Sequence, residues 1–296
     1  MKRFLFAVGA ILLVIGTPVW GWWSNGHGIL TQAAVKALPE EMPAFFRAGE
    51  GMIAHCAFDP DISKNRGTPY VRGAEHPEHY LDLELLRGSP LPKSRYEFIQ
   101  LCAELGIKPE TVGFIPYALA EWTERLAVAF AEHRKWPDSP FIQQKCFVYA
   151  GFIAHYAQDM CQPLHLTVHF NGRRQADGST LNRGIHEKVD ALIEYFALDP
   201  DELARNQEIA PLDDLMDDIL KQVKTVYAMV EQVYELAESL PSTRGGEWTR
   251  VPKVVDFATE RARESARFTA ALYLTAWKQS EKIRLEGWLD RANFDK

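Results

Sequence analysis

The chain has 296 residues, and 47% of them are hydrophobic, which is enough for a substantial core and excludes general disorder. Its formal net charge of −7 argues against a protein that holds duplex nucleic acid by charge alone. Bound divalent cations would reverse that sign locally, so an anionic substrate remains open.

The first 21 residues have the pattern of a secretory signal. Lys2 and Arg3 form a basic start, and residues 4–16 are apolar but too short to span a bilayer comfortably. Cleavage before Trp22 would remove two positive charges and move the formal charge from −7 to −9. An uncleaved membrane anchor is the alternative. We expect a secreted or periplasmic monomer without stable membrane insertion after cleavage.

Helical patterns dominate the rest, and no convincing hairpin or alternating strand pattern is present. In chain order, the spacing of apolar residues predicts helices over 26–38, 41–56 (a second and a short third), 94–105, 109–135, 140–161, 184–197, 212–240 and 256–283. Loops are expected at 62–78, 166–183 and 241–251, and a short extended or turn segment at 79–84. The sequence therefore predicts a single all-α domain after the signal.

Two His-x3-Asp pairs lie in the middle of the chain. They are His155 with Asp159 and His186 with Asp190, so each pair projects from one face of an expected helix. His165 lies between them, just past a proline that should end the helix near Gln162 and let the chain fold back. A lone pair of this kind is usually a surface contact. Two pairs that flank a third histidine indicate a metal centre, and imidazole with carboxylate suits Zn²⁺.

Four cysteines are present, and export would permit disulfides. Cys146 and Cys161 share an expected helix and would lie about 22 Å apart along it, too far to bridge. The sequence leaves a bridge between Cys56 and Cys102 open. Cys161 is expected to be a small buried residue rather than a ligand.

Four segments together resemble the zinc-dependent phospholipase C and S1/P1 nuclease superfamily. They are WWSNGH (22–27), HYLD (79–82), HYAQDMCQPLH (155–165) and IHEKVD (185–190), with a weaker likeness at SARFTAALYLTAW in the last expected helix. The H-x3-D-x2-Q-P-x-H element is quite specific. The resemblance runs from Trp22 to Asp190. It implies an α-helical domain over residues 22–296 that binds three zinc ions.

Carried over residue by residue, the resemblance implies nine ligand positions. One zinc ion would take Asp61, His79, His155 and Asp159, and a second would take His165, His186 and Asp190. The third would take the amine and carbonyl of Trp22 with His27, and Asp159 would bridge it to the first.

The sequence offers an alternative to Asp61 as the metal ligand in this segment. Asp59 is two residues away and equally able to coordinate, but Lys64 follows Asp61 at a spacing common in the nucleases. The gap from Asp61 to His79 is longer than the family pattern, which indicates an insertion.

The resemblance implies a secreted zinc-dependent hydrolase of phosphodiester bonds. A hydroxide held by two metal ions would be the nucleophile, and Asp159 and Asp61 would serve catalysis as ligands of those ions. No protein nucleophile is needed, and no G-x-S-x-G or P-loop motif is present. Arg173, Arg174 and Arg183 lie in the loop between ligands, where solvated charges are a simpler interpretation than phosphate contacts.

Single-stranded nucleic acid is the favoured substrate, and phospholipid is the alternative. The five-residue step from Trp22 to His27 is typical of the nucleases. Tyr80 and Asp82 match their base-stacking aromatic residue and base-reading aspartate. The phospholipases have a similar H-F-x-D segment, so this match discriminates poorly.

Two departures bear on the choice of substrate. Asn25 lies near the place where the phospholipases have an acidic residue for choline, and loop 171–184 lacks the glycine-rich pattern typical of the nucleases. A further alternative is a non-catalytic metal- or lipid-binding secreted protein. The complete ligand set argues against it.

Overall fold

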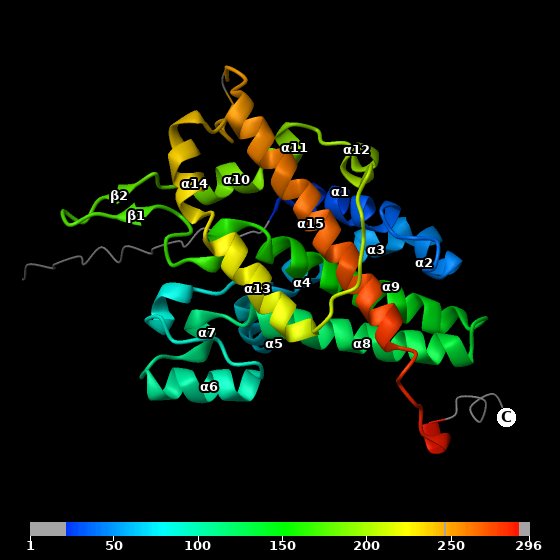
Figure 1. Ribbon diagram of the computed structural model, residues 1–296. Helices are drawn as coiled ribbons and strands as arrows, with labels where there is room; N and C mark the ends of the chain where they lie inside the picture. The colour runs from blue at the N-terminus through cyan, green and yellow to red at the C-terminus, as the bar shows by residue number, and fades with distance from the viewer. Residues whose placement is uncertain (1–21, 246, 290–296) are drawn as a thin grey trace, which may run out of the picture.

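The computed structural model describes residues 22–245 and 247–289 (Figure 1). The expected signal at residues 1–21 lies outside this range, and none of the helices within it is both long and apolar enough to cross a membrane. The α-helices are α1 (Ser24–Lys36), α2 (Ala44–Ala48), α3 (Glu50–Cys56), α4 (Asp59–Ser63), α5 (Pro69–Glu75), α6 (Arg95–Glu104), α7 (Pro109–Val112), α8 (Ile115–Lys135), α9 (Pro140–Met160), α10 (Ile185–Asp190), α11 (Leu192–Tyr195), α12 (Pro200–Ala204), α13 (Leu215–Tyr227), α14 (Val230–Leu236) and α15 (Pro252–Gln279). The 3₁₀ helices are η1 (His76–His79), η2 (Leu83–Leu86), η3 (Pro163–Leu166), η4 (Ala237–Ser239) and η5 (Gly287–Leu289). The predicted all-α class is confirmed.

Three long helices form the centre of the molecule. The helices α8 and α9, with 21 residues each, pack side by side, and α15, with 28 residues, packs against both (Figure 1). Each has a proline in its first turn, where the missing N–H costs nothing. Because α1 and α3 also cover α9, the polar residues on its inner face, His155 and Asp159, are fully buried.

The predicted helix ends that have the clearest local sequence signals are confirmed. Ser94 caps α6 through a reciprocal capping box with Glu97, and the helix ends at Glu104 before Gly106. The helix α9 ends at Met160, next to the predicted stop near Gln162. Beyond it, the short helix η3 turns the chain back and carries His165.

The sequence predicts one helix over 109–135, but the structure has two, α7 and α8. Gly113 separates α7 from α8 with a backbone φ of 100°. A Cβ atom at this position would lie 2.1 Å from the carbonyl oxygen of Tyr80. Glycine is therefore required both by the backbone angle and by the close approach of the Tyr80 segment.

Replacing Gly113 with alanine should destabilise the protein by about 3 kcal/mol, because backbone strain and steric overlap add together. Denaturant unfolding measures the change. Gly178→Ala is the matched control, because Gly178 also has a positive φ of 83° but no atom within 4 Å of an added Cβ. Its cost should be about 1–2 kcal/mol, from backbone strain alone. Equal costs for the two variants would contradict the close-approach argument.

Several other predicted boundaries are wrong, most of them because the helices are short. The predicted 62–78 loop contains the end of α4, all of α5 and most of η1, and α12 was missed. The predicted helix over 212–240 divides into α13, α14 and η4, that over 184–197 divides into α10 and α11, and α15 starts at Pro252 rather than 256. One- or two-turn helices give little periodicity and depend on tertiary packing.

A small hairpin corrects the expectation of no strands. In the predicted 166–183 loop, β1 (Arg173–Arg174) pairs antiparallel with β2 (Thr180–Leu181). The Asp177-Gly178 dipeptide lies at its turn, with Gly178 at positive φ, and this was the available signal. The four cysteines are all buried and unbridged, so Cys56 and Cys102 form no disulfide.

Candidate metal centre

Helix α9 supplies the central pair of the site. His155 and Asp159 lie one turn apart, and the Nε2 atom of His155 is 3.3 Å from Oδ2 of Asp159. The Nδ1 atom of His155 lies 2.8 Å from the carbonyl oxygen of Ala57. A carbonyl only accepts, so Nδ1 carries the proton and Nε2 presents a lone pair to the site.

The first cluster joins His155 to Asp61 on α4 and His79 at the end of η1. The ligand atoms of these three residues all lie within 4.8 Å of one another. The Oδ1 atom of Asp61 is 3.6 Å from Nε2 of His155 and 3.8 Å from Nδ1 of His79. Among the described residues, Asp61 joins a potential metal cluster and Asp59 joins none.

The second cluster contains His165 from η3 with His186 and Asp190 from α10. His165 donates from Nδ1 to the carbonyl oxygen of His79 at 2.7 Å, so its Nε2 is bare. Gln162 donates to Oδ1 of Asp190 at 2.8 Å and also accepts from a backbone N–H, which fixes the carboxylate from behind.

The third cluster brings His27 of α1 to His155 and Asp159. Oδ1 of Asp159 is 3.4 Å from Nε2 of His27, whereas Oδ2 is 3.0 Å from Nδ1 of His79. The two oxygens of Asp159 thus face different histidines, which suits a carboxylate shared by two ions.

Trp22 lies against the same helix end. Its side chain is buried, and its indole N–H donates to the carbonyl oxygen of Gln158 at 3.0 Å. The next residue, Trp23, donates its N–H to the carbonyl oxygen of Asp190 at 3.3 Å. The start of the described chain is therefore held beside the clusters, while coordination by the Trp22 amine stays a prediction.

Buried polar atoms without partners test whether these residues fit cations. The Nε2 atoms of His27, His165 and His186 and the Oδ1 atom of Asp159 are buried and make no hydrogen bond. Such atoms are costly unless something else satisfies them. Of the nine such side-chain atoms in the described residues, six lie on residues of the three clusters, so the donor set fits metal ions, and imidazole with carboxylate favours zinc.

The electrostatics of the clusters also suit metal binding. Burial lowers the pKa of His27, His165 and His186, which keeps them in the neutral form that binds metal. Burial alone would raise the pKa of Asp159, but its histidine neighbours hold that pKa well below the usual range. Burial raises the pKa of Asp190, and a bound cation would favour its ionised form instead.

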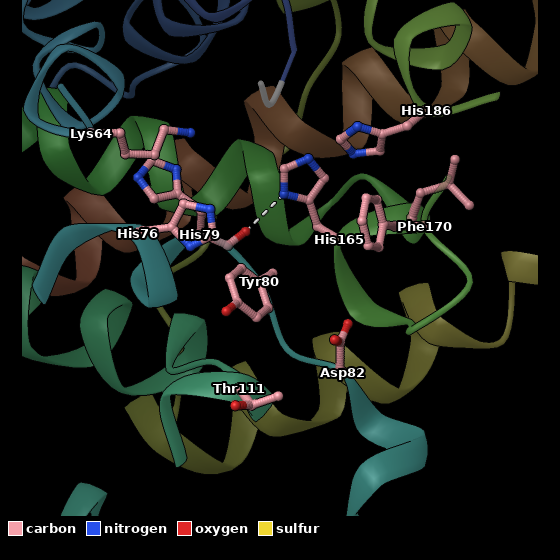
Figure 2. Close-up of a pocket in the computed structure, with 10 residues that line it drawn as sticks. Lys64, His76, His79, Tyr80, Asp82, Thr111, His165, Phe170 and His186 are labelled. Carbon is pink, nitrogen blue, oxygen red and sulfur yellow. Dashed lines mark hydrogen bonds between the residues drawn. The ribbon is translucent and has the colours of Figure 1, made fainter. Parts of the chain in front are cut away.

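A cavity of about 250 Å³ opens beside the clusters. Figure 2 shows His79, His165 and His186 on one side of it, with Tyr80, Asp82 and Thr111 on the other and Phe170 next to His165. Tyr80 is fixed by donation from its hydroxyl to the carbonyl oxygen of Glu110 at 2.7 Å. Burial, helped by the charge of Glu84, raises the pKa of Asp82 to about 7.

The Asp82 carboxyl should make stability depend on pH. Its pKa in the folded protein is about 7 against an ordinary 3.8, so the unfolded chain loses this proton first as pH rises. Stability therefore falls as pH rises from about 4 to about 7. In zinc-free protein, Asp82→Asn should raise the melting temperature by about 2 °C or more at pH 8, and by less at pH 5.

Thermal unfolding at the two pH values measures this effect. Asp177→Asn is the control, because hydrogen bonds to Ser179 lower the pKa of Asp177 and its replacement should give no gain at pH 8. If Asp82→Asn gave the same gain at pH 5 and pH 8, the assigned ionisation would be wrong.

An open groove of about 620 Å³ continues from the cavity along α5. His76 lines both, and Arg66, Arg72 and Glu110 line the groove. None of the three loop arginines lines either space. One of them, Arg173, pairs with Glu231 and stacks on Tyr234, in agreement with a surface role.

Three supporting residues were missed by the sequence analysis. They are Gln158, which contacts His27, Gln162, which contacts Asp190, and Glu75, which accepts from Tyr156 and lies 3.4 Å from Nε2 of His79. The two glutamines lie inside the motif HYAQDMCQPLH, where a buried amide beside ligands was the available signal. Nothing in the sequence marks Glu75.

No protein-family description and no curated protein matches this chain. Among solved structures, it is similar to the alpha toxin of Clostridium absonum, at 14% sequence identity and a TM-score of 0.47. It is also similar to the alpha-toxin of Clostridium perfringens from an avian strain, at 12% identity and a TM-score of 0.44. Each alignment covers 90% of this chain and 68% of the toxin chain. The likeness concerns the arrangement of the chain, at identities that assign no activity.

Proposed function

We propose that this chain is a zinc-dependent hydrolase of phosphodiester bonds. The observation that carries the proposal is the convergence of three His/Asp clusters, two of which share His155, around Asp159, whose oxygens face His27 of one cluster and His79 of another. Asp61, His79, His165, His186, Asp190 and His27 complete them, and Trp22 is proposed to add its amine. Three zinc ions are proposed, and export to the periplasm or medium as a monomer remains part of the proposal.

The chain's own residues would divide the work between holding ions and orienting the substrate. When bound, adjacent zinc ions supply a lowered pKa for water and polarisation of the phosphoryl group. Asp159 would hold two ions at a fixed separation, because its oxygens face different histidines. Tyr80 and Phe170 give the cavity aromatic walls, and Asp82 gives it one carboxyl group.

We place phospholipid first among the substrates, because exposed apolar residues lie next to the groove on α5. Ile62, Tyr70 and Val71 are 64%, 93% and 50% exposed, and the last two lie between groove residues on α5. The aliphatic side chains of Ile62 and Val71 gain from a lipid surface, whereas a polynucleotide offers them little. The basic residues Arg66 and Arg72 suit lipid phosphates.

Single-stranded nucleic acid is the second candidate. The Tyr80 ring could stack a base, Asp82 could hydrogen-bond its edge, and the groove beyond His76 could follow a phosphate chain. The short step from Trp22 to His27 also favours this class by resemblance. The two candidates share one metal centre and differ in what the adjoining surface binds.

Side-by-side assays test both levels of the proposal. Zinc-replete and chelated protein would be assayed on bis(p-nitrophenyl) phosphate, phosphatidylcholine vesicles, single-stranded DNA and RNA. Zinc-dependent hydrolysis of the small ester is expected, with vesicles hydrolysed faster than nucleic acid. Metal binding without any hydrolysis would support the non-catalytic alternative and overturn the proposal.

The surface residues give a sharper test of the substrate. The double variant Tyr70→Ser, Val71→Ser should lose vesicle hydrolysis and keep hydrolysis of the small ester. Tyr96→Ser is the control, because Tyr96 is 84% exposed on α6 and lines neither the cavity nor the groove. Equal vesicle activity in the two variants would remove the argument for phospholipid.

A further inference from the structure

One buried side chain between α1 and α9 has no assigned role. Gln158 lies between His155 and Asp159 on α9, and its side chain is wholly buried. Its Oε1 atom is 2.7 Å from Nδ1 of His27, and its Nε2 atom donates to Oγ1 of Thr31 at 3.0 Å. Thr31 is also wholly buried, one turn beyond His27 on α1.

The hydrogen bonds can be oriented by following which atoms can only accept. The hydroxyl of Thr31 donates to the carbonyl oxygen of His27 at 2.7 Å, and that carbonyl has no proton to give. Because the hydroxyl proton of Thr31 is engaged in this bond, the hydroxyl oxygen can only accept a hydrogen bond from Gln158. Gln158 must then turn its NH₂ group toward Thr31 and its carbonyl oxygen toward His27.

The orientation of the amide decides the state of the histidine. A carbonyl oxygen facing Nδ1 of His27 requires a proton on Nδ1, so the neutral ring has a bare Nε2. That Nε2 is buried without a hydrogen bond and faces Oδ1 of Asp159 at 3.4 Å. With the amide reversed, an NH₂ group would face Nδ1, which would move the ring proton to Nε2 and block the metal side.

We propose that Thr31 and Gln158 form a relay that holds His27 in the one tautomer able to bind a metal ion through Nε2. They are positioning residues, because the polar side-chain atoms of both are engaged in hydrogen bonds to His27 and to each other. The proposal rests on the proposed metal centre, but it concerns which ring nitrogen of His27 carries the proton in the zinc-free protein. It is independent of which phosphodiester is the substrate.

The same glutamine also fixes the N-terminal segment. Its backbone carbonyl oxygen accepts from the indole of Trp22, while its side chain holds α1 through His27 and Thr31. The ring of His27 stacks on that of His155, with 4.1 Å between centroids, which limits its tilt. One residue of α9 therefore sets both the position of the third cluster and the proton arrangement within it.

Threonine variants test the relay at a distance from the metal. Thr31→Val should weaken binding of the third zinc ion by about 10–100-fold, measured by titration against a competing chelator. Thr31→Ser keeps the hydroxyl and should bind as the wild type does. Thr123→Val is the matched control, because Thr123 makes the same buried hydroxyl contact, to the carbonyl oxygen of Leu119 at 2.8 Å.

Glutamine variants separate orientation from packing. Gln158→Met removes the acceptor and should weaken the third site about as much as Thr31→Val does. Gln158→Glu accepts through either oxygen and needs no orientation by Thr31. Adding Thr31→Val to Gln158→Glu should therefore change zinc affinity by less than about threefold, although the buried carboxylate lowers stability.

Histidine-¹⁵N NMR of the zinc-free proteins reads the tautomer directly. His27 should be protonated at Nδ1 in the wild type and shift toward the Nε2–H form in Thr31→Val, with a His27→Gln variant assigning the signal. The relay would be refuted if Thr31→Val and Thr123→Val gave the same tautomer and zinc affinity. Absence of zinc from the wild type would instead refute the metal centre.

Discussion

Replacing Asp159 with asparagine should reduce phosphodiesterase activity to less than about a tenth of wild type, because losing a shared metal ligand costs several kcal/mol. Asparagine keeps the shape of the side chain but removes the charge between two cations. The two oxygens of Asp159 face His27 and His79, which belong to different clusters, so one substitution disturbs the contacts of both. Activity on the small ester and zinc content by elemental analysis measure the effect.

Asp190→Asn is the matched comparison, because the histidine that Asp190 faces, His186, belongs to the same cluster as Asp190. It should cost less activity than Asp159→Asn. Activity above about a tenth of wild type in Asp159→Asn would refute the bridging role. Comparing Asp59→Asn with Asp61→Asn identifies the ligand on α4, where Asp61 is expected to matter more.

A chain that begins with a retained methionine before Trp22 should fold but lack one zinc ion and most of its activity. A free α-amine has an ordinary pKa of about 7.7–8.0, so a metal ion can displace its proton near neutral pH. A peptide nitrogen cannot, because its lone pair is delocalised. Trp22 is buried and hydrogen-bonded to Gln158, so added residues would crowd the third cluster.

A third variant distinguishes the role of the Trp22 α-amine from that of its indole ring. Trp22→Phe with a free N-terminus should keep three zinc ions, although it loses the hydrogen bond to Gln158. If Trp22 served only as a packing residue, this substitution would do the greater damage and the added methionine would be harmless. Equal zinc content and rate in the methionine-extended and free chains would refute the role of the amine.

The long elements were predictable because their local signals agree. The proline before His165 marks the end of α9, and Ser94 with Glu97 marks the start of α6. In both places, the sequence rule concerns atoms a few residues apart. The same holds for the pair His155 and Asp159, whose common face follows from helix periodicity alone.

The rest depended on contacts between distant segments. The glycine that divides α7 from α8 is required by the Tyr80 backbone, which is 33 positions away in the chain. The short helices α4 and α5 have too few turns to show a period, yet α4 carries Asp61 to the clusters. The role of Gln158 needed the direction of a hydrogen bond to Thr31, which no sequence pattern encodes.

Because α4 is short, its folded conformation should depend on the metal ion that it helps to bind. A five-residue helix has little stability of its own, and α4 brings to the first cluster a carboxylate whose nearest cation is Lys64, at 2.5 Å. We therefore expect zinc scarcity to release this segment by local unfolding, while the α8, α9 and α15 amides stay protected from hydrogen exchange. Metal supply would then control proteolytic nicking near residues 59–75 before it affects the global melting temperature.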